Sequence, residues 1–219
     1  MNKSDFDKCY TFFAEMYGVI HSDDALIIMK KYFPSLDKKE MNKDLKERLG
    51  NKELNYAVYS VDNNKYIISF KGYGSKDINR LFMVQSNKPF FIPSNFEQME
   101  YYINNDYWFE ENEELIIDLT DFFDDHLTKI KDDKKRRDIA INIVFKLAIT
   151  IHHSILMVPP QMIVEFIESE GVELTNEKEV MEFMNYYQRL NNNIRMVCNR
   201  GFTPHELSLL RKDNDDHSA

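Results

Sequence analysis

The first fifty residues alternate between apolar and polar positions with the period of an α-helix. A helix is predicted over residues 6–20, because one face carries aromatic side chains at helical spacing: Phe6, Tyr10, Phe13 and Tyr17. A second predicted helix, over 23–32, stops before Pro34. A third, over 38–49, follows Asp37, a residue type that accepts hydrogen bonds at helix N-termini.

The hydrophobic period changes from helical to alternating after residue 55. β-Branched and aromatic residues at 56–61 and 66–70 flank the turn Asp62-Asn63-Asn64, a pattern that predicts an antiparallel β-hairpin. A further strand is predicted at 81–85. From Ser94 onward the pattern is helical again, with helices predicted at 95–104, 112–130, 133–158, 160–170 and 176–197 and a short last one after Thr203-Pro204.

These elements predict an α+β protein that is mostly α. Three helices followed by a hairpin predict an N-terminal winged-helix-like module over residues 1–90. An α-helical bundle is predicted over 91–211, and the polar residues 212–219 are predicted to form a disordered tail.

The winged-helix order makes the third helix the candidate DNA-binding element, because the corresponding helix of a helix-turn-helix lies in the major groove. Lys39, Lys43 and Lys46 follow i, i+4, i+7 spacing and can share one solvent face. Together with Arg48, and with Lys65 in the hairpin, they are the predicted DNA-binding residues.

The distribution of charge along the chain supports the prediction that the third helix binds DNA. The 219-residue chain has 37 acidic and 28 basic residues, a formal net charge of −9, which argues against phosphate binding over the whole surface. Residues 30–49, by contrast, hold seven basic and four acidic residues, a local charge of +3. A solvated helix with internal salt pairs is the alternative interpretation, since suitable spacing joins Glu40 with Lys43, Lys43 with Glu47 and Asp44 with Arg48.

Composition narrows the class of protein further. Hydrophobic residues make up 43% and aromatic residues 13%, values that exclude a disordered chain. Cys9 and Cys198 are too few for a four-cysteine zinc site, and with no secretory signal they predict free thiols in a reducing cytoplasm. The apolar run 139–159 is interrupted by polar residues and predicts a buried helix rather than a membrane span.

Motifs of known enzymes are missing from the sequence. It contains no phosphate-binding loop, no GxSxG, no HExxH and no kinase signature, so we expect no catalytic residue, no cofactor and no metal site. The acidic stretch 106–125 lacks EF-hand spacing and is interpreted as a solvated face or as a docking face for a protein partner. The adjacent His152 and His153 are interpreted as core residues, because neighbours on a helix point about 100° apart.

The most specific motif lies near the C-terminus. Residues 191–207, NNNIRMVCNRGFTPHEL, resemble the pattern NN-x-x-R-M-x-x-N-R-G-x-T-P-x-E-L. That pattern occurs in poorly characterised proteins of low-GC Gram-positive bacteria and their mobile elements, often before a zinc-binding SEC-C segment. This chain lacks the SEC-C cysteines, so zinc binding is not carried over.

Two interpretations of this motif remain open. It can form a rigid helical corner, or it can be a polar docking surface in which Arg195, Asn199 and Arg200 bind a partner. The resemblance implies a bacterial, mobile-element or phage protein and supplies no reaction.

The expected function is regulation or interaction without catalysis, in the cytoplasm, through DNA, a protein partner or both. No membrane partner is expected, and a homodimer is left open. The alternative is an inhibitor that binds a host protein, such as a nucleic-acid enzyme, through the acidic stretch.

Overall fold

The structure is a computed structural model that describes residues 1–62, 65–103, 107–156 and 158–216. The chain forms two compact units. Unit 1 comprises residues 1–105 and 196–202, and unit 2 comprises residues 106–195 and 203–219. The division therefore falls at residue 105 rather than at the predicted residue 90, and seven residues near the C-terminus return to unit 1.

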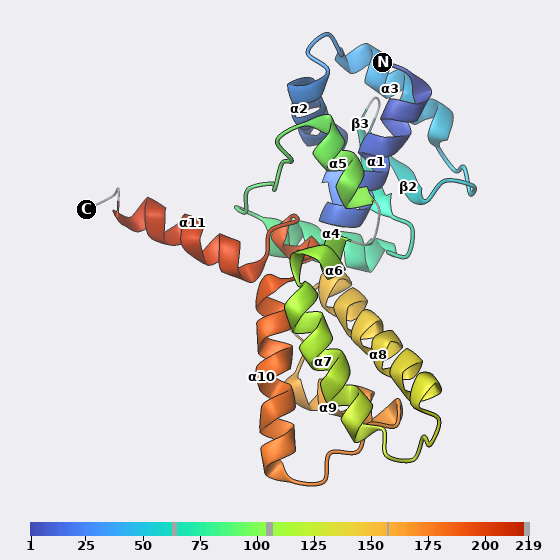
Figure 1. The fold of residues 1–219 in the computed structure, drawn as a ribbon. Helices are drawn as coiled ribbons and strands as arrows, with labels where there is room; N and C mark the ends of the chain where they lie inside the picture. The colour runs from blue at the N-terminus through green and yellow to red at the C-terminus, as the bar shows by residue number, and fades with distance from the viewer. Residues whose placement is uncertain (63–64, 104–106, 157, 217–219) are drawn as a thin grey trace. The chain divides into compact units, whose positions relative to one another are not determined.

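Unit 1 contains a small antiparallel sheet surrounded by helices (Figure 1). Its strands follow the order β1-β3-β2, and both pairings are antiparallel. The elements in chain order are α1 (Lys3–Tyr17), β1 (Val19–His21), α2 (Ser22–Tyr32), α3 (Lys38–Arg48), β2 (Tyr56–Asp62), β3 (Lys65–Phe70), α4 (Ser75–Gln85), α5 (Phe96–Ile103) and the 3₁₀ turn η1 (Val197–Asn199).

The predicted fold class is confirmed, because three helices precede a β-hairpin in a mostly helical chain. The short strand β1, which the sequence pattern missed, extends the β2–β3 hairpin to three strands by pairing Ile20 with Ile68. Of the predicted turn, Asp62 ends β2 opposite Lys65, and residues 63–64 lie outside the described residues. The result is a winged-helix-like module in which α3 directly precedes the hairpin.

Aromatic side chains of α1 form the core of unit 1. Phe12, Phe13 and Tyr17 have no exposed surface, and the Phe13 and Tyr17 rings stack with centroids 5.7 Å apart. The Tyr17 hydroxyl donates a hydrogen bond of 2.5 Å to the carbonyl of Phe91. Buried Gln85 donates from its amide to the carbonyl of Tyr17 at 2.6 Å, which ties the end of α4 to the end of α1.

The strand predicted at 81–85 is wrong, since this segment is the end of helix α4. The residues that α4 buries, Ile78, Leu81 and Gln85, follow the i, i+3, i+7 spacing of a helix. A five-residue window cannot distinguish that spacing from a short buried strand.

Unit 2 is helical. Its elements are α6 (Tyr107–Glu111), α7 (Glu113–His126), α8 (Asp133–His153), α9 (Pro160–Ser169), α10 (Glu177–Asn193) and α11 (Pro204–Asp216). Figure 1 shows α7, α8 and α10 side by side, and their facing residues Leu119, Phe123, Val144, Leu147 and Phe183 are fully buried. Because α11 continues to Asp216, the predicted disorder is wrong for residues 212–216, and residues 217–219 lie outside the described part.

The apolar run 139–159 is mostly α8, whose buried face includes Ile143, Val144 and Leu147. Among the described helices, none has the combination of length and apolar character that crossing a bilayer needs.

Gly18 is required by both conformation and space. It ends α1 at φ +69°, and a Cβ there would lie 2.9 Å from a ring carbon of Tyr73. Gly50 has almost the same φ, +70°, but nothing lies within 4 Å of its Cβ position.

We predict that Gly50→Ala lowers the free energy of unfolding by about 1 kcal/mol, because only the backbone conformation of residue 50 is then strained. Gly18→Ala should lower the free energy of unfolding by roughly 1–3 kcal/mol more than Gly50→Ala does, because its added methyl group overpacks the core.

Equilibrium urea unfolding of the two alanine variants measures this difference. Equal losses would contradict the packing role of Gly18.

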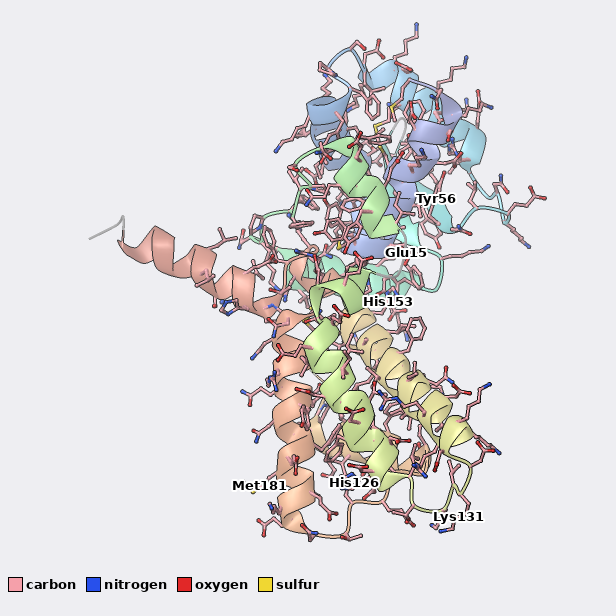
Figure 2. The ribbon with its side chains drawn as sticks, viewed as in Figure 1. Glu15, Tyr56, His126, Lys131, His153 and Met181 are labelled. Carbon is pink, nitrogen blue, oxygen red and sulfur yellow. The ribbon has the colours of Figure 1, made fainter. Side chains whose placement is uncertain are left out.

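Glu15 lies on α1 and is labelled in Figure 2. Burial raises the pKa of its carboxyl group to about 7, from an ordinary value of 4.5. The folded state then holds the proton more tightly than the unfolded chain does. This contribution to stability is complete below about pH 4.5 and is lost as the pH rises through about 7.

We predict that Glu15→Gln flattens the pH dependence of stability over that interval. The measurement is urea unfolding of both proteins at several pH values between about 5 and 8. Parallel pH profiles would show that Glu15 does not bind the proton on folding.

Candidate nucleic-acid interface

Helix α3 presents one face to the core and the opposite face to solvent. Asp37 begins the helix by accepting a hydrogen bond of 2.7 Å from the Glu40 amide, as its sequence position predicts. The buried side chains recur at i, i+3, i+4 and i+7: Met41, Asp44, Leu45 and Arg48. Lys39, Lys43 and Lys46 lie outside this set and are exposed.

The exposed lysines line an open groove of about 550 Å³. The groove is bordered by α3 and by one residue of β3, and its lining residues are Lys38, Lys39, Asn42, Lys43, Lys46 and Tyr66. We call it the lysine groove. Three of the five predicted DNA-binding residues therefore lie together on one surface.

The acidic residues of α3 are engaged away from the groove. Glu40 lies 2.8 Å from the N-terminal amine, Glu47 lies 3.2 Å from the Lys3 amine, and Asp44 lies 2.6 Å from the Arg48 guanidinium. Of the three predicted internal salt pairs, the described residues form only Asp44–Arg48. Glu40 and Glu47, which have the spacing to neutralise Lys43, bind other cations.

Three of the four lysines of the lysine groove lack a direct carboxylate partner among the described residues. Within the part of the chain that the structure describes, Lys39, Lys43 and Lys46 have no carboxylate within 4.0 Å. Lys38 lies 2.6 Å from Asp23, but both side chains are about half exposed, so water weakens this ion pair.

Arg48, the fourth of the predicted DNA-binding residues, is buried and does not line the lysine groove; its relative exposure is 8%. Its guanidinium binds the carboxylates of Asp44 and Asp7 and donates a 2.7 Å hydrogen bond to the Tyr56 hydroxyl. It also lies over the ring of Tyr10, 5.5 Å from the centroid. The sequence contained a signal for this burial, since Arg48 shares a helix face with Met41.

Tyr56, labelled in Figure 2, completes this buried cluster from β2. Its hydroxyl donates to Asp7 at 2.8 Å, and burial raises its pKa well above the ordinary value, so it stays protonated. Arg48 thereby connects α3 to α1 and to the sheet, and these bonds hold the lysine face outward.

Lys65 is exposed, as predicted, but does not line the lysine groove. It lies in a separate depression of about 340 Å³ whose lining includes the carboxylates of Asp23, Asp24 and Asp62. These acids reduce the local positive charge, so the structure separates Lys65 from the other predicted residues.

Arg195 in unit 2, one of the predicted partner-binding residues, is likewise buried. Its side chain is 7% exposed and forms ion pairs with Glu206 at 2.9 Å and Glu111 at 3.3 Å. Its carbonyl accepts a 2.6 Å hydrogen bond from buried His152, which confirms the interpretation of that histidine as a core residue. Thr203 and Glu206 bind each other's backbone amides, as the predicted cap requires.

Asn199 and Arg200, the other two predicted partner-binding residues, make contacts within unit 1. Asn199 is 9% exposed and accepts a hydrogen bond from the Lys88 amine at 2.9 Å. Arg200, at φ +52°, donates to the Lys88 carbonyl and lies 4.1 Å from the centroid of the Phe90 ring. The following Gly201, at φ +83°, has a positive φ as the corner interpretation expects.

The acidic stretch 106–125 is partly neutralised within unit 2, and its first residue lies outside the described residues. Three carboxylates of α7 pair with arginines of α8 and α10: Asp118 with Arg189, Asp121 with Arg137 and Asp124 with Arg136. The described residues contain no group of three or more side chains that could hold a metal ion.

The geometry defines a winged-helix-like module with a positively charged groove. No protein-family model, curated protein or solved structure matches the chain. The resemblance of residues 191–207 to bacterial and mobile-element proteins stays a prediction.

The buried position of Arg48 leads to a stability prediction. Arg48→Met leaves Asp44 buried without its cation, which should lower the free energy of unfolding by about 3–5 kcal/mol. The matched control is Arg137→Met, since Arg137 pairs with Asp121 at a largely exposed site and its loss should cost about 1 kcal/mol or less. Urea unfolding compares the two variants, and equal losses would contradict the buried role of Arg48.

Proposed function

We propose that this chain is a non-catalytic regulatory protein that binds duplex DNA through the lysine groove on α3. One observation carries the proposal: Lys39, Lys43 and Lys46 share an exposed face, and the acids that could neutralise them bind other groups. Like charges at this spacing repel and lower helix stability slightly. A polyanion that contacts all three relieves this repulsion.

The setting of the groove also supports a phosphate backbone as the ligand. Lysine side chains bind phosphates, and release of condensed counterions drives such binding. The net charge of −9 on the whole chain opposes non-specific binding elsewhere, so a polyanion is directed to the lysine groove.

Duplex DNA suits the groove better than single strands do. Proteins that bind single strands stack bases on exposed aromatic rings, whereas the one aromatic residue lining the groove, Tyr66, is only 5% exposed. The deep and narrow major groove of duplex RNA does not admit side chains. The major groove of B-DNA admits a whole helix such as α3.

The remaining parts of the proposal rest on weaker support. Cys9 and Cys198 are free and buried, which suits a cytoplasmic protein. The motif at residues 191–207 suits a bacterial or mobile-element source. A homodimer stays a prediction that DNA with paired half-sites would reveal.

An inhibitor that docks on a host protein through residues 106–125 is the less favoured alternative. The three arginine pairs of α7 reduce the charge available to a partner. Co-purification of a host protein in place of DNA would favour this alternative.

We predict that binding to a duplex of about 20 base pairs weakens steeply with salt, with a slope of about −0.9 in log K against log salt for each phosphate contact. Replacing Lys39, Lys43 and Lys46 together by alanine should reduce the slope by about 3 and weaken binding at low salt at least tenfold. Fluorescence anisotropy of a labelled duplex measures both quantities.

The control replaces Lys131, Lys134 and Lys135 by alanine, three exposed lysines of which the first precedes α8 and the other two lie in its first turn (Lys131 is labelled in Figure 2). This variant has the same net charge as the groove variant and should bind like the unmodified protein. Absence of binding at low salt, or equal weakening in the two variants, would refute the proposed function.

A further inference from the structure

Tyr66 is the residue through which the sheet lines the lysine groove. Along β3 its side chain lies on the same side of the sheet as that of Ile68, because side chains two residues apart share a face, and Ile68 has no exposed surface. Helix α3 contacts β3. Tyr66 is 5% exposed, so nearly all of its ring is buried and its small exposed part lines the groove.

The hydroxyl of Tyr66 is a hydrogen-bond donor that the fold does not use. Within the described residues it forms no hydrogen bond, and its oxygen keeps surface that is accessible to solvent. Two other buried tyrosines of unit 1 do use their hydroxyls, since Tyr17 donates to the Phe91 carbonyl and Tyr56 donates to the Asp7 carboxylate. Tyr66 therefore holds a donor in a fixed position at the base of the groove.

The neighbouring charges select the chemical class of ligand for this donor. Lys39, Lys43 and Lys46 line the same groove, so a group that accepts from the Tyr66 hydroxyl lies among three ammonium groups. An anion with several acceptor oxygens suits these donors, and a phosphate group is such an anion. Tyrosine hydroxyls are among the side-chain groups that bind DNA phosphates.

From this placement, and resting on the proposed function, we propose that the lysine groove holds one phosphate group of the DNA backbone against the Tyr66 hydroxyl, which donates a hydrogen bond to it. The lysines neutralise the charge of the backbone, and the hydroxyl, carried on a buried ring, gives the contact a fixed direction. Strand β3 then binds the backbone together with α3, which fixes how α3 lies on the duplex without reading its sequence.

Tyr66→Phe removes the hydroxyl and leaves the ring in place. Hydrogen bonds to charged groups are stronger than those between neutral groups, so binding of a duplex of about 20 base pairs should weaken about tenfold. The salt slope should not change, because a neutral hydroxyl releases no counterion. The loss should be the same for duplexes of different sequence. Fluorescence anisotropy measures all three quantities.

Tyr59→Phe is the matched control, because Tyr59 lies on β2, is 42% exposed and does not line the lysine groove. This variant should bind DNA like the unmodified protein. Urea unfolding is a second control. Since the Tyr66 hydroxyl has no partner among the described residues, Tyr66→Phe should unfold at the same urea midpoint as the unmodified protein.

Nuclear magnetic resonance of the protein with carbon-13 in its tyrosine rings observes the contact directly. Duplex DNA should shift the Cζ signal of Tyr66, which is identified by its absence from Tyr66→Phe, and should leave the signal of Tyr59 in place. Inorganic phosphate, added alone to a second sample, distinguishes a site for any phosphate group from a site that needs the duplex.

Salt-sensitive duplex binding that Tyr66→Phe leaves unchanged, without a shift of the Tyr66 signal, would overturn this role of Tyr66 and leave the proposed function standing. A lowered urea midpoint for Tyr66→Phe would do the same, because the hydroxyl would then serve the fold. A Tyr66 shift with inorganic phosphate but no binding of the duplex would support the phosphate site and overturn the proposed function. Absence of both the shift and the binding would overturn both.

Discussion

The buried guanidinium of Arg48 is the interaction on which the rest of the structure depends. It neutralises Asp44 on the core side of α3 and connects the helix to Asp7 of α1 and Tyr56 of β2. A buried charge is stable only when it is paired and hydrogen-bonded, so this cluster permits one orientation of α3. In that orientation three lysines point to solvent, and the acids of the same helix are occupied elsewhere.

Local signals in the sequence were sufficient to predict α3 and the hairpin. The Asp37 cap, the spacing of Met41 and Leu45 and the alternation in β2 and β3 all depend on near neighbours along the chain. The lysine face followed from the same spacing. The position of Arg48 on the same helix face as Met41 indicated its burial, but its partner Asp7 could not be predicted in this way, because Asp7 lies 41 residues away. An arginine at the edge of a basic run looks the same in sequence whether it binds phosphate or a buried carboxylate.

The C-terminal motif also shows that partners far apart in the sequence could not be predicted. Its polar residues suggested a docking surface, yet Arg195 and Asn199 are buried and bonded to distant residues such as Glu111 and Lys88. The predicted capping of α11 by Thr203 was right because it involves only the next three residues. Features set within one or two turns of a helix were therefore predictable, while the roles of charged residues that pair across the fold were not.

The proposed function requires that duplex DNA cover the outward face of α3 and no other basic surface. Chemical acetylation of the lysines, read by mass spectrometry with and without a saturating duplex, tests it residue by residue. We expect DNA to protect Lys39, Lys43 and Lys46 and to leave Lys134 and Lys135 as reactive as in the free protein. Equal reactivity of the α3 lysines with and without DNA would contradict the account.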